Sequence, residues 1–72
     1  MKLAFTLDTS DASQRPQAAE ICTRVAQYAA ETGETLAFVS RTKPVTFYLG
    51  KRLYEVEIRT MRGGYYLCCK EK

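Results

Sequence analysis

Residues 45–60 read VTFYLGKRLYEVEIRT, two runs of alternating side chains separated by Gly50-Lys51. Alternation of apolar and polar residues with a period of two is typical of β-strands that bury one face. Glycine at the first position of a two-residue turn favours a tight hairpin. In that register Phe47 faces Tyr54, so the large apolar side chains of both strands share one side. The stretch therefore predicts a hairpin that covers a core with one of its faces.

The next part of the chain predicts a second hairpin on the same face. Residues 65–69 follow a turn at either 63–64 or 62–63, since both pairs contain glycine. With either turn, alternate residues of this run lie on the same face of the sheet as the apolar side chains of the first hairpin. Agreement between two hairpins is stronger evidence than one strand prediction. The predicted sheet contribution to the core is Val45, Phe47, Tyr54, Val56, Ile58, Leu67 and Cys69.

The N-terminal half predicts a strand followed by a helix. Residues 3–7 alternate like a half-buried strand, whereas residues 14–32 repeat apolar side chains at helical spacing. We expect Ser13 to cap this helix, Pro16 to fit its first turn, and Gly33 to end it. The apolar stripe is Ala18, Ile21, Cys22, Val25, Tyr28 and Ala29.

Residues 36–40 form a further predicted strand, so the elements run β-α-β-β-β-β. This order predicts an α+β fold with two layers, one helix packed on one face of a mainly antiparallel sheet. We expect residues 1–72 to form a single domain. A chain of 72 residues hides only about 60% of the surface of its unfolded form, which leaves no room for a buried pocket of enzyme size beside the core.

The composition argues against catalysis, metal binding and membrane insertion. The chain has no histidine, which removes the commonest general base and metal ligand, and its three cysteines match no zinc spacing. No phosphate-binding loop motif is present. The longest apolar run, residues 36–39, is far too short to cross a bilayer. We predict a cytoplasmic protein that is not an enzyme, has no cofactor and does not bind membranes, with its cysteines reduced.

One helix covers one face of a sheet, so the other face meets water or a partner. On that open face the alternation places Tyr48, Leu53 and Tyr66, and the expected partner is a second copy or another protein. We take these three residues as the candidate partner-binding site of a small binding or self-associating module. Ala37 and Val39 are expected on the same face. A thiol-dependent role for Cys68, also predicted to be exposed there, is a further alternative.

Charge suggests a second functional class, the single-stranded nucleic-acid-binding proteins. Residues 1–35 carry three cations against five anions, a net charge of −2, whereas residues 36–72 carry eight cations against three anions, a net charge of +5. A basic sheet with exposed tyrosines is the usual platform for such ligands. Against this, Glu55 and Glu57 in mid-sheet would repel a phosphate backbone. The candidate nucleic-acid-binding residues are Arg41, Lys43, Lys51, Arg52, Arg59, Arg62 and Lys70.

Two segments carry a resemblance to a known family. Residues 38–56, with the run Lys-Pro-Val-Thr-Phe, and residues 62–71, which begin Arg-Gly-Gly-Tyr, resemble small bacterial proteins of about 70 residues that contain a domain of unknown function. The resemblance extends over nearly the whole chain. It implies a bacterial cytoplasmic origin, and it implies no activity and no catalytic residues.

Overall fold

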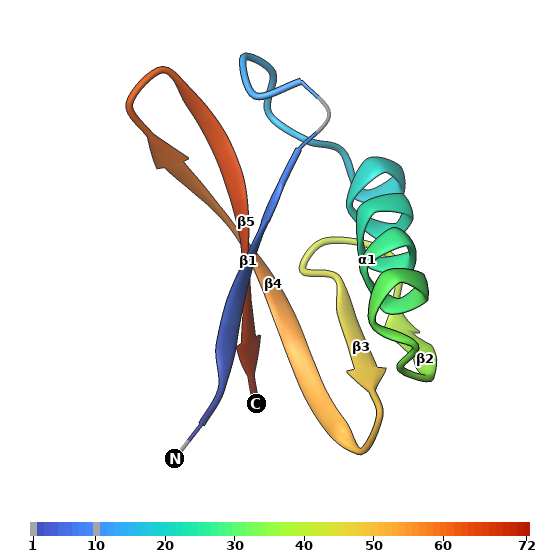
Figure 1. Ribbon diagram of the computed structural model, residues 1–72. Helices are drawn as coiled ribbons and strands as arrows, with labels where there is room; N and C mark the ends of the chain where they lie inside the picture. The colour runs from blue at the N-terminus through green and yellow to red at the C-terminus, as the bar shows by residue number, and fades with distance from the viewer. Residues whose placement is uncertain (1, 10) are drawn as a thin grey trace.

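The computed structural model describes residues 2–9 and 11–72, and within them one helix and five strands follow in the predicted order (Figure 1). The α+β class and the β-α-β-β-β-β order are thereby confirmed. The elements are β1 (Ala4–Asp8), α1 (Ala18–Thr32), β2 (Leu36–Ser40), β3 (Thr46–Leu49), β4 (Arg52–Met61) and β5 (Gly64–Glu71).

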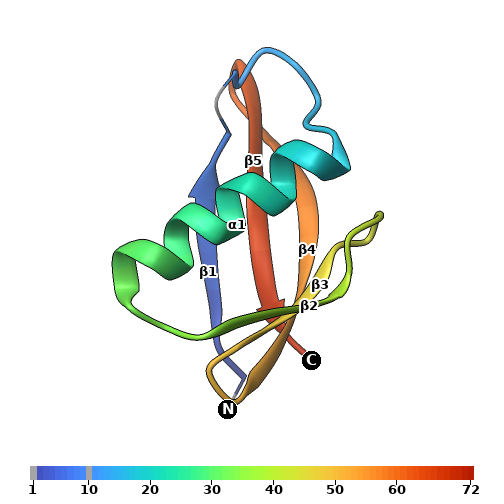
Figure 2. The same cartoon turned by 90° about the vertical axis from the view of Figure 1, so that its right-hand side faces the viewer.

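The strands form one antiparallel sheet in the order β1-β5-β4-β3-β2. The strands on either side of the helix in sequence, β1 and β2, are therefore the two edges of the sheet, and α1 crosses its face diagonally between them (Figure 2). Because β1 pairs with β5, the two chain ends lie at the same end of the sheet (Figure 1). There the Glu71 N–H donates to the Leu3 carbonyl oxygen at 2.9 Å.

Both long hairpins turn at a glycine with positive φ. Gly50 has φ 63° and begins the β3–β4 turn, as predicted. In the second hairpin Met61 pairs with Gly64, so the turn lies at Arg62-Gly63, the earlier of the two predicted positions. Gly63 has φ 83°, which a residue without Cβ adopts without strain. Since both registers keep the same face toward the core, the predicted core is unaffected.

The helix begins at Ala18 rather than at residue 14. Residues 11–14 form a turn of their own, in which the Gln14 N–H donates to the Asp11 carbonyl oxygen at 3.1 Å. Ser13 is not the helix cap, because its N–H and its hydroxyl both donate to the Asp11 carboxylate. Pro16 lies before the helix and is buried, and it disfavours helical geometry in the residue that precedes it.

The helix ends where the sequence predicts. Gly33 has φ 76° and its N–H donates to the carbonyl oxygen of Ala29 at 2.9 Å. A left-handed residue at this place satisfies a carbonyl that the last helical turn leaves without a partner.

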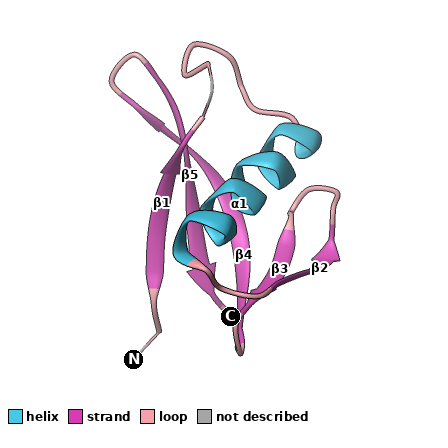
Figure 3. Ribbon diagram, turned by 45° about the vertical axis from the view of Figure 1, so that its right-hand side comes forward, coloured by secondary structure: helices cyan, strands magenta, loops and turns pink. Residues whose placement is uncertain are grey.

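The core lies between α1 and the face of the sheet that α1 crosses (Figure 3). Ile21, Val25 and Ala29 are the buried residues of the helix. Phe47 stacks on Tyr54 with ring centroids 5.6 Å apart. The predicted sheet contribution is confirmed: Val45, Phe47, Tyr54, Val56, Leu67 and Cys69 are buried, and Ile58 packs against them at partial burial.

Candidate functional site

The open face of the sheet carries the residues that the alternation predicted. Cross-strand pairing sets Tyr48 beside Leu53, Glu57 beside Cys68, and Arg59 beside Tyr66. No helix or strand of the described residues covers this face, as the views in Figures 1 and 3 agree. The face is therefore the largest part of the sheet available to a partner.

Four apolar side chains gather at one end of this face. Tyr48 lies between Ala37 on β2 and Leu53 on β4 in the same cross-strand row, and Val39 follows two residues after Ala37. The exposed fraction is 61% for Val39 and 43% for Tyr48. We call Ala37, Val39, Tyr48 and Leu53 the apolar end. Sequence reasoning placed Val39 on this face but gave it no role, although its alternation with Phe38 already indicated exposure.

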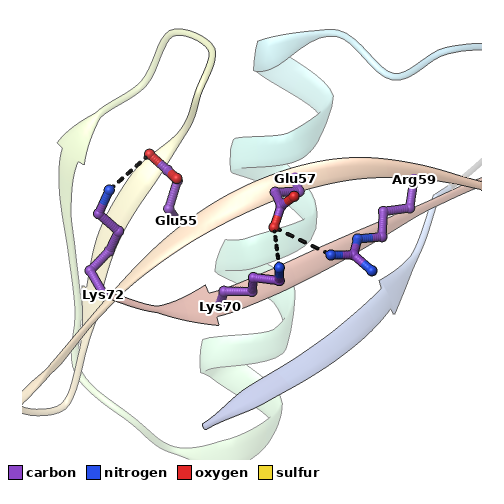
Figure 4. A network of polar contacts seen from close by, with 5 residues as sticks. All are labelled: Glu55, Glu57, Arg59, Lys70 and Lys72. Carbon is purple, nitrogen blue, oxygen red and sulfur yellow. Dashed lines mark hydrogen bonds and ion pairs between the residues drawn. The ribbon is translucent and has the colours of Figure 1, made fainter. Parts of the chain in front are cut away.

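Ion pairs cross the middle of the face (Figure 4). The Lys70 ammonium lies 2.9 Å from the Glu57 carboxylate, and the Arg59 guanidinium lies 3.5 Å from the same oxygen. Lys72 contacts Glu55 at 3.3 Å. The hydrogen bond from Lys70 is the main reason why the pKa of Glu57 lies below its ordinary value, and the charges of Lys70 and Arg59 act in the same direction. The ion pairs between β4 and β5 therefore join residues that are diagonal, and not directly opposite, in the register.

The structure separates Tyr66 from the other two candidate partner-binding residues. Tyr48 and Leu53 are neighbours, but Tyr66 lies beside Arg59, six residues farther along β4 than Leu53. Six residues of a strand span about 20 Å. The Glu57 ion pairs lie in between. A single contact centred on the apolar end therefore includes Tyr48 and Leu53 without Tyr66.

The seven basic candidates do not line one track. Arg59 and Lys70 are paired with Glu57, and the Arg52 guanidinium lies 3.0 Å from the Glu71 carboxylate. The Arg41 guanidinium lies over the Phe38 ring, 4.4 Å from its centroid. The remaining three occupy three different connections: Lys43 between β2 and β3, Lys51 between β3 and β4, and Arg62 between β4 and β5.

The thiols of Cys68 and Cys69 are buried, and that of Cys22 is partly buried. Cys68 lies on the open face, as expected from the alternation, but it is only 7% exposed, so its predicted exposure is wrong. Its strand neighbours on this face, Glu57 across β4 and Lys70 along β5, are much larger side chains joined by an ion pair. Burial, followed by the neighbouring Cys68 charge, raises the pKa of Cys69 to about 12. Such a thiol is not a nucleophile near neutral pH.

A groove on the helix side of the sheet was not foreseen from the sequence. It has a volume of about 420 Å³ and lies where β3 begins, against Arg15, Ile21, Lys43, Pro44, Val45 and Ile58 among others. Its residues come from three distant segments, so no local pattern reports it. Within residues 2–9 and 11–72, no group of potential metal ligands comes together, and no helix has the length and apolar character needed to span a membrane.

Comparison with known proteins gives one match. A family model described as a domain of unknown function (DUF4318) matches residues 5–72, which contain all of the elements above except the first residue of β1. Both segments that carried the resemblance in the sequence lie inside the match, so that resemblance is confirmed. No curated protein and no solved structure matches the chain.

Proposed function

Because the chain belongs to the DUF4318 family, a domain of unknown function, we propose its role from its surface: it is a small non-catalytic binding module that forms a homodimer through the apolar end of its open face. The observation that carries this proposal is the exposure of Tyr48, which lies beside Leu53, and of Val39 on the neighbouring strand β2, on an uncovered sheet face. Burying apolar surface contributes about 25 cal/mol per Å².

The charge of the open face favours a second copy as the occupant. Three carboxylates and three cations lie on it: Asp8, Glu55, Glu57, Arg59, Lys70 and Lys72. Carboxylates and cations therefore nearly balance on this face, whereas the whole chain carries +3. Two copies repel each other least when they meet through these faces. A contact with two-fold symmetry also brings the same surface of both copies together, so the carboxylates of one copy can meet the cations of the other.

The size of the face sets the expected strength. A stable interface buries about 800 Å² on each partner, and the chain exposes 4776 Å² in all. The apolar end is only part of what such an interface needs. We therefore expect a weak, concentration-dependent dimer, with a dissociation constant of about 10 µM to 1 mM.

Sedimentation of the full chain across that concentration range tests the proposal. Val39→Lys should weaken the dimer at least about tenfold, because it places a cation within an apolar contact, equivalent to about 1.4 kcal/mol. Gln27→Lys, which adds the same charge at an exposed position of α1, is the matched control and should leave the dimer unchanged. A strict monomer at about 1 mM, or equal effects of the two substitutions, would overturn the proposal.

We also propose that the protein acts in the bacterial cytoplasm. Its three cysteines are free, and reduced thiols persist in that compartment. Fractionation of a bacterial cell that carries the tagged gene is the direct check, and recovery with the membrane or periplasm would contradict it.

A further inference from the structure

The second half of β4 has an open edge. β3 covers β4 only as far as Val56, whose N–H donates to the Val45 carbonyl oxygen at 2.9 Å. Alternate residues of a strand direct their N–H and C=O groups to the same side. The main-chain groups of Ile58 and Thr60 therefore point past the start of β3, where they meet no main-chain partner among the described residues. We call this edge, from Ile58 to Thr60, the β4 notch.

The missing partner strand has a local cause. Continued in the same register, β3 would set Lys43 opposite Ile58. Residues 41–44 instead form the bend that connects β2 to β3, so the chain leaves the sheet before it reaches that position. The β4 notch is thus a place for a strand that this chain does not supply.

The groove of about 420 Å³ adjoins the β4 notch at Ile58. Its accessible apolar lining comes from Ile58, which is partly exposed, and from Pro44, which is exposed, whereas Ile21 and Val45 border it but are fully buried. Figure 2 shows the start of α1 and the β2–β3 connection on the same side of β4, and these segments contribute Arg15 and Lys43 to the lining.

The charge at the groove is positive and uncompensated. The side chains of Arg15 and Lys43 form no ion pair or hydrogen bond with any described residue. Glu57 also borders the groove, but its carboxylate is held on the opposite face by Lys70. The positive end of the α1 dipole lies at the same end of the helix as Arg15.

From these features we infer that the β4 notch binds an extended acidic peptide by strand addition. The peptide lies antiparallel to β4, in line with β3, and exchanges main-chain hydrogen bonds with Ile58 and Thr60. Val45 already holds the position opposite Val56, so the peptide ends its pairing opposite Ile58. An acidic residue there lies beside Arg15 and Lys43, which line the groove together with Ile58. The aliphatic residue two positions earlier lies opposite Thr60 with its side chain on the same face. This site lies on the helix side of the sheet and is distinct from the open face.

Fluorescence anisotropy with a labelled acetyl-Glu-Thr-Val-Thr-Glu-amide peptide tests the inference on the full chain. Binding should be saturable below about 1 mM. Lys43→Glu and Arg15→Glu should each weaken it at least about tenfold. Lys51→Glu, the same charge change in a different connection, is the matched control and should have little effect. Val39→Lys should also bind the peptide normally, so failure of the homodimer leaves this inference intact.

Amide hydrogen exchange tests the mode of binding. In the free protein, Ile58 and Thr60 should exchange faster than Glu57 and Arg59, which pair with β5. Saturating peptide should slow Ile58 and Thr60 selectively. The inference is overturned if no binding occurs at about 1 mM, if a Lys-Thr-Val-Thr-Lys peptide binds as well, or if these two amides stay unprotected. If an oligonucleotide binds at the groove more tightly than the peptide, the inferred peptide ligand is wrong and the groove binds nucleic acid.

Discussion

Glu71 joins the first strand to the β3–β4 hairpin through both of its carboxylate oxygens. One oxygen accepts a hydrogen bond from the Leu3 N–H at 2.9 Å, and the other lies 3.0 Å from the Arg52 guanidinium. The bond from Leu3 is the main cause that lowers the pKa of Glu71 from its ordinary value, and Arg52 adds to it. A carboxylate held in this way stabilises the fold only while it is ionised.

Glu71→Gln should therefore change how stability depends on pH. Because folding lowers the pKa of Glu71, its contribution is present above about pH 4.5 and is lost as the pH falls through the lower value in the folded protein. The variant should be less stable at pH 7 and should lose less stability on acidification than the parent chain. Urea unfolding from pH 7 to about pH 3 measures both. Glu31→Gln, an exposed helical control, should keep the parent's slope; an identical slope for Glu71→Gln would contradict the assignment.

Single side chains also mark the limit of sequence-based prediction. Alternation assigned Cys68 to the correct face, because a strand offers only two faces. Alternation could not indicate that Cys68 is buried. Burial depends on the directions taken by larger neighbouring side chains, such as Glu57 and Lys70. Tyr66 and Tyr48 share the predicted face but lie far apart on it, because Tyr48 pairs with Leu53 and Tyr66 pairs with Arg59, six residues farther along β4.

At the scale of elements, the end of a helix was predictable where it requires a particular backbone conformation, and it was not predictable where no such conformation is required. Gly33 ends α1 as expected, because few other residues adopt a left-handed conformation there. The start of α1 was placed four residues early, since the hydrogen bonds of Asp11 compete locally with helix formation. The β4 notch was not predictable from a local pattern, because it exists only where β4 extends past the start of the shorter strand β3.

Gly33→Ala should lower the free energy of unfolding by about 1 kcal/mol. A Cβ at this position meets nothing within 4 Å, so the loss comes from the backbone conformation at φ 76° and not from a clash. Gly33→Asn should lose less, because asparagine tolerates this region better. The midpoint of urea unfolding measures the difference. If alanine and asparagine are equally well tolerated, the left-handed end of α1 does not matter for stability.

At the scale of the whole molecule, the described residues form one helix and five strands around one small core. Phe47 is completely buried at its centre and contacts the rings of both Phe38 and Tyr54. A domain of this length has a total stability of about 4–11 kcal/mol. A large fraction of that total rests on a few side chains, which the sequence identified correctly because the two hairpins agree on one face.

Phe47→Ala should cost about 3–5 kcal/mol and leave the domain close to its unfolding threshold at 37 °C. Phe47→Leu, which retains most of the volume, should cost less and keep a cooperative transition. Thermal unfolding followed by far-ultraviolet circular dichroism distinguishes the two. A Phe47→Ala protein that melts at the temperature of the parent would show that the core is not organised around this ring.

The pairing of β1 with β5 has a kinetic consequence. Partners such as Ala4 and Lys70 are separated by nearly the entire chain, so the sheet acquires its last strand only after the loop between them has been closed at an entropic cost. Chains dominated by such distant contacts fold more slowly than helical bundles of equal length. The β4–β5 hairpin can form early, as a local event, and β1 then docks onto an edge that already exists.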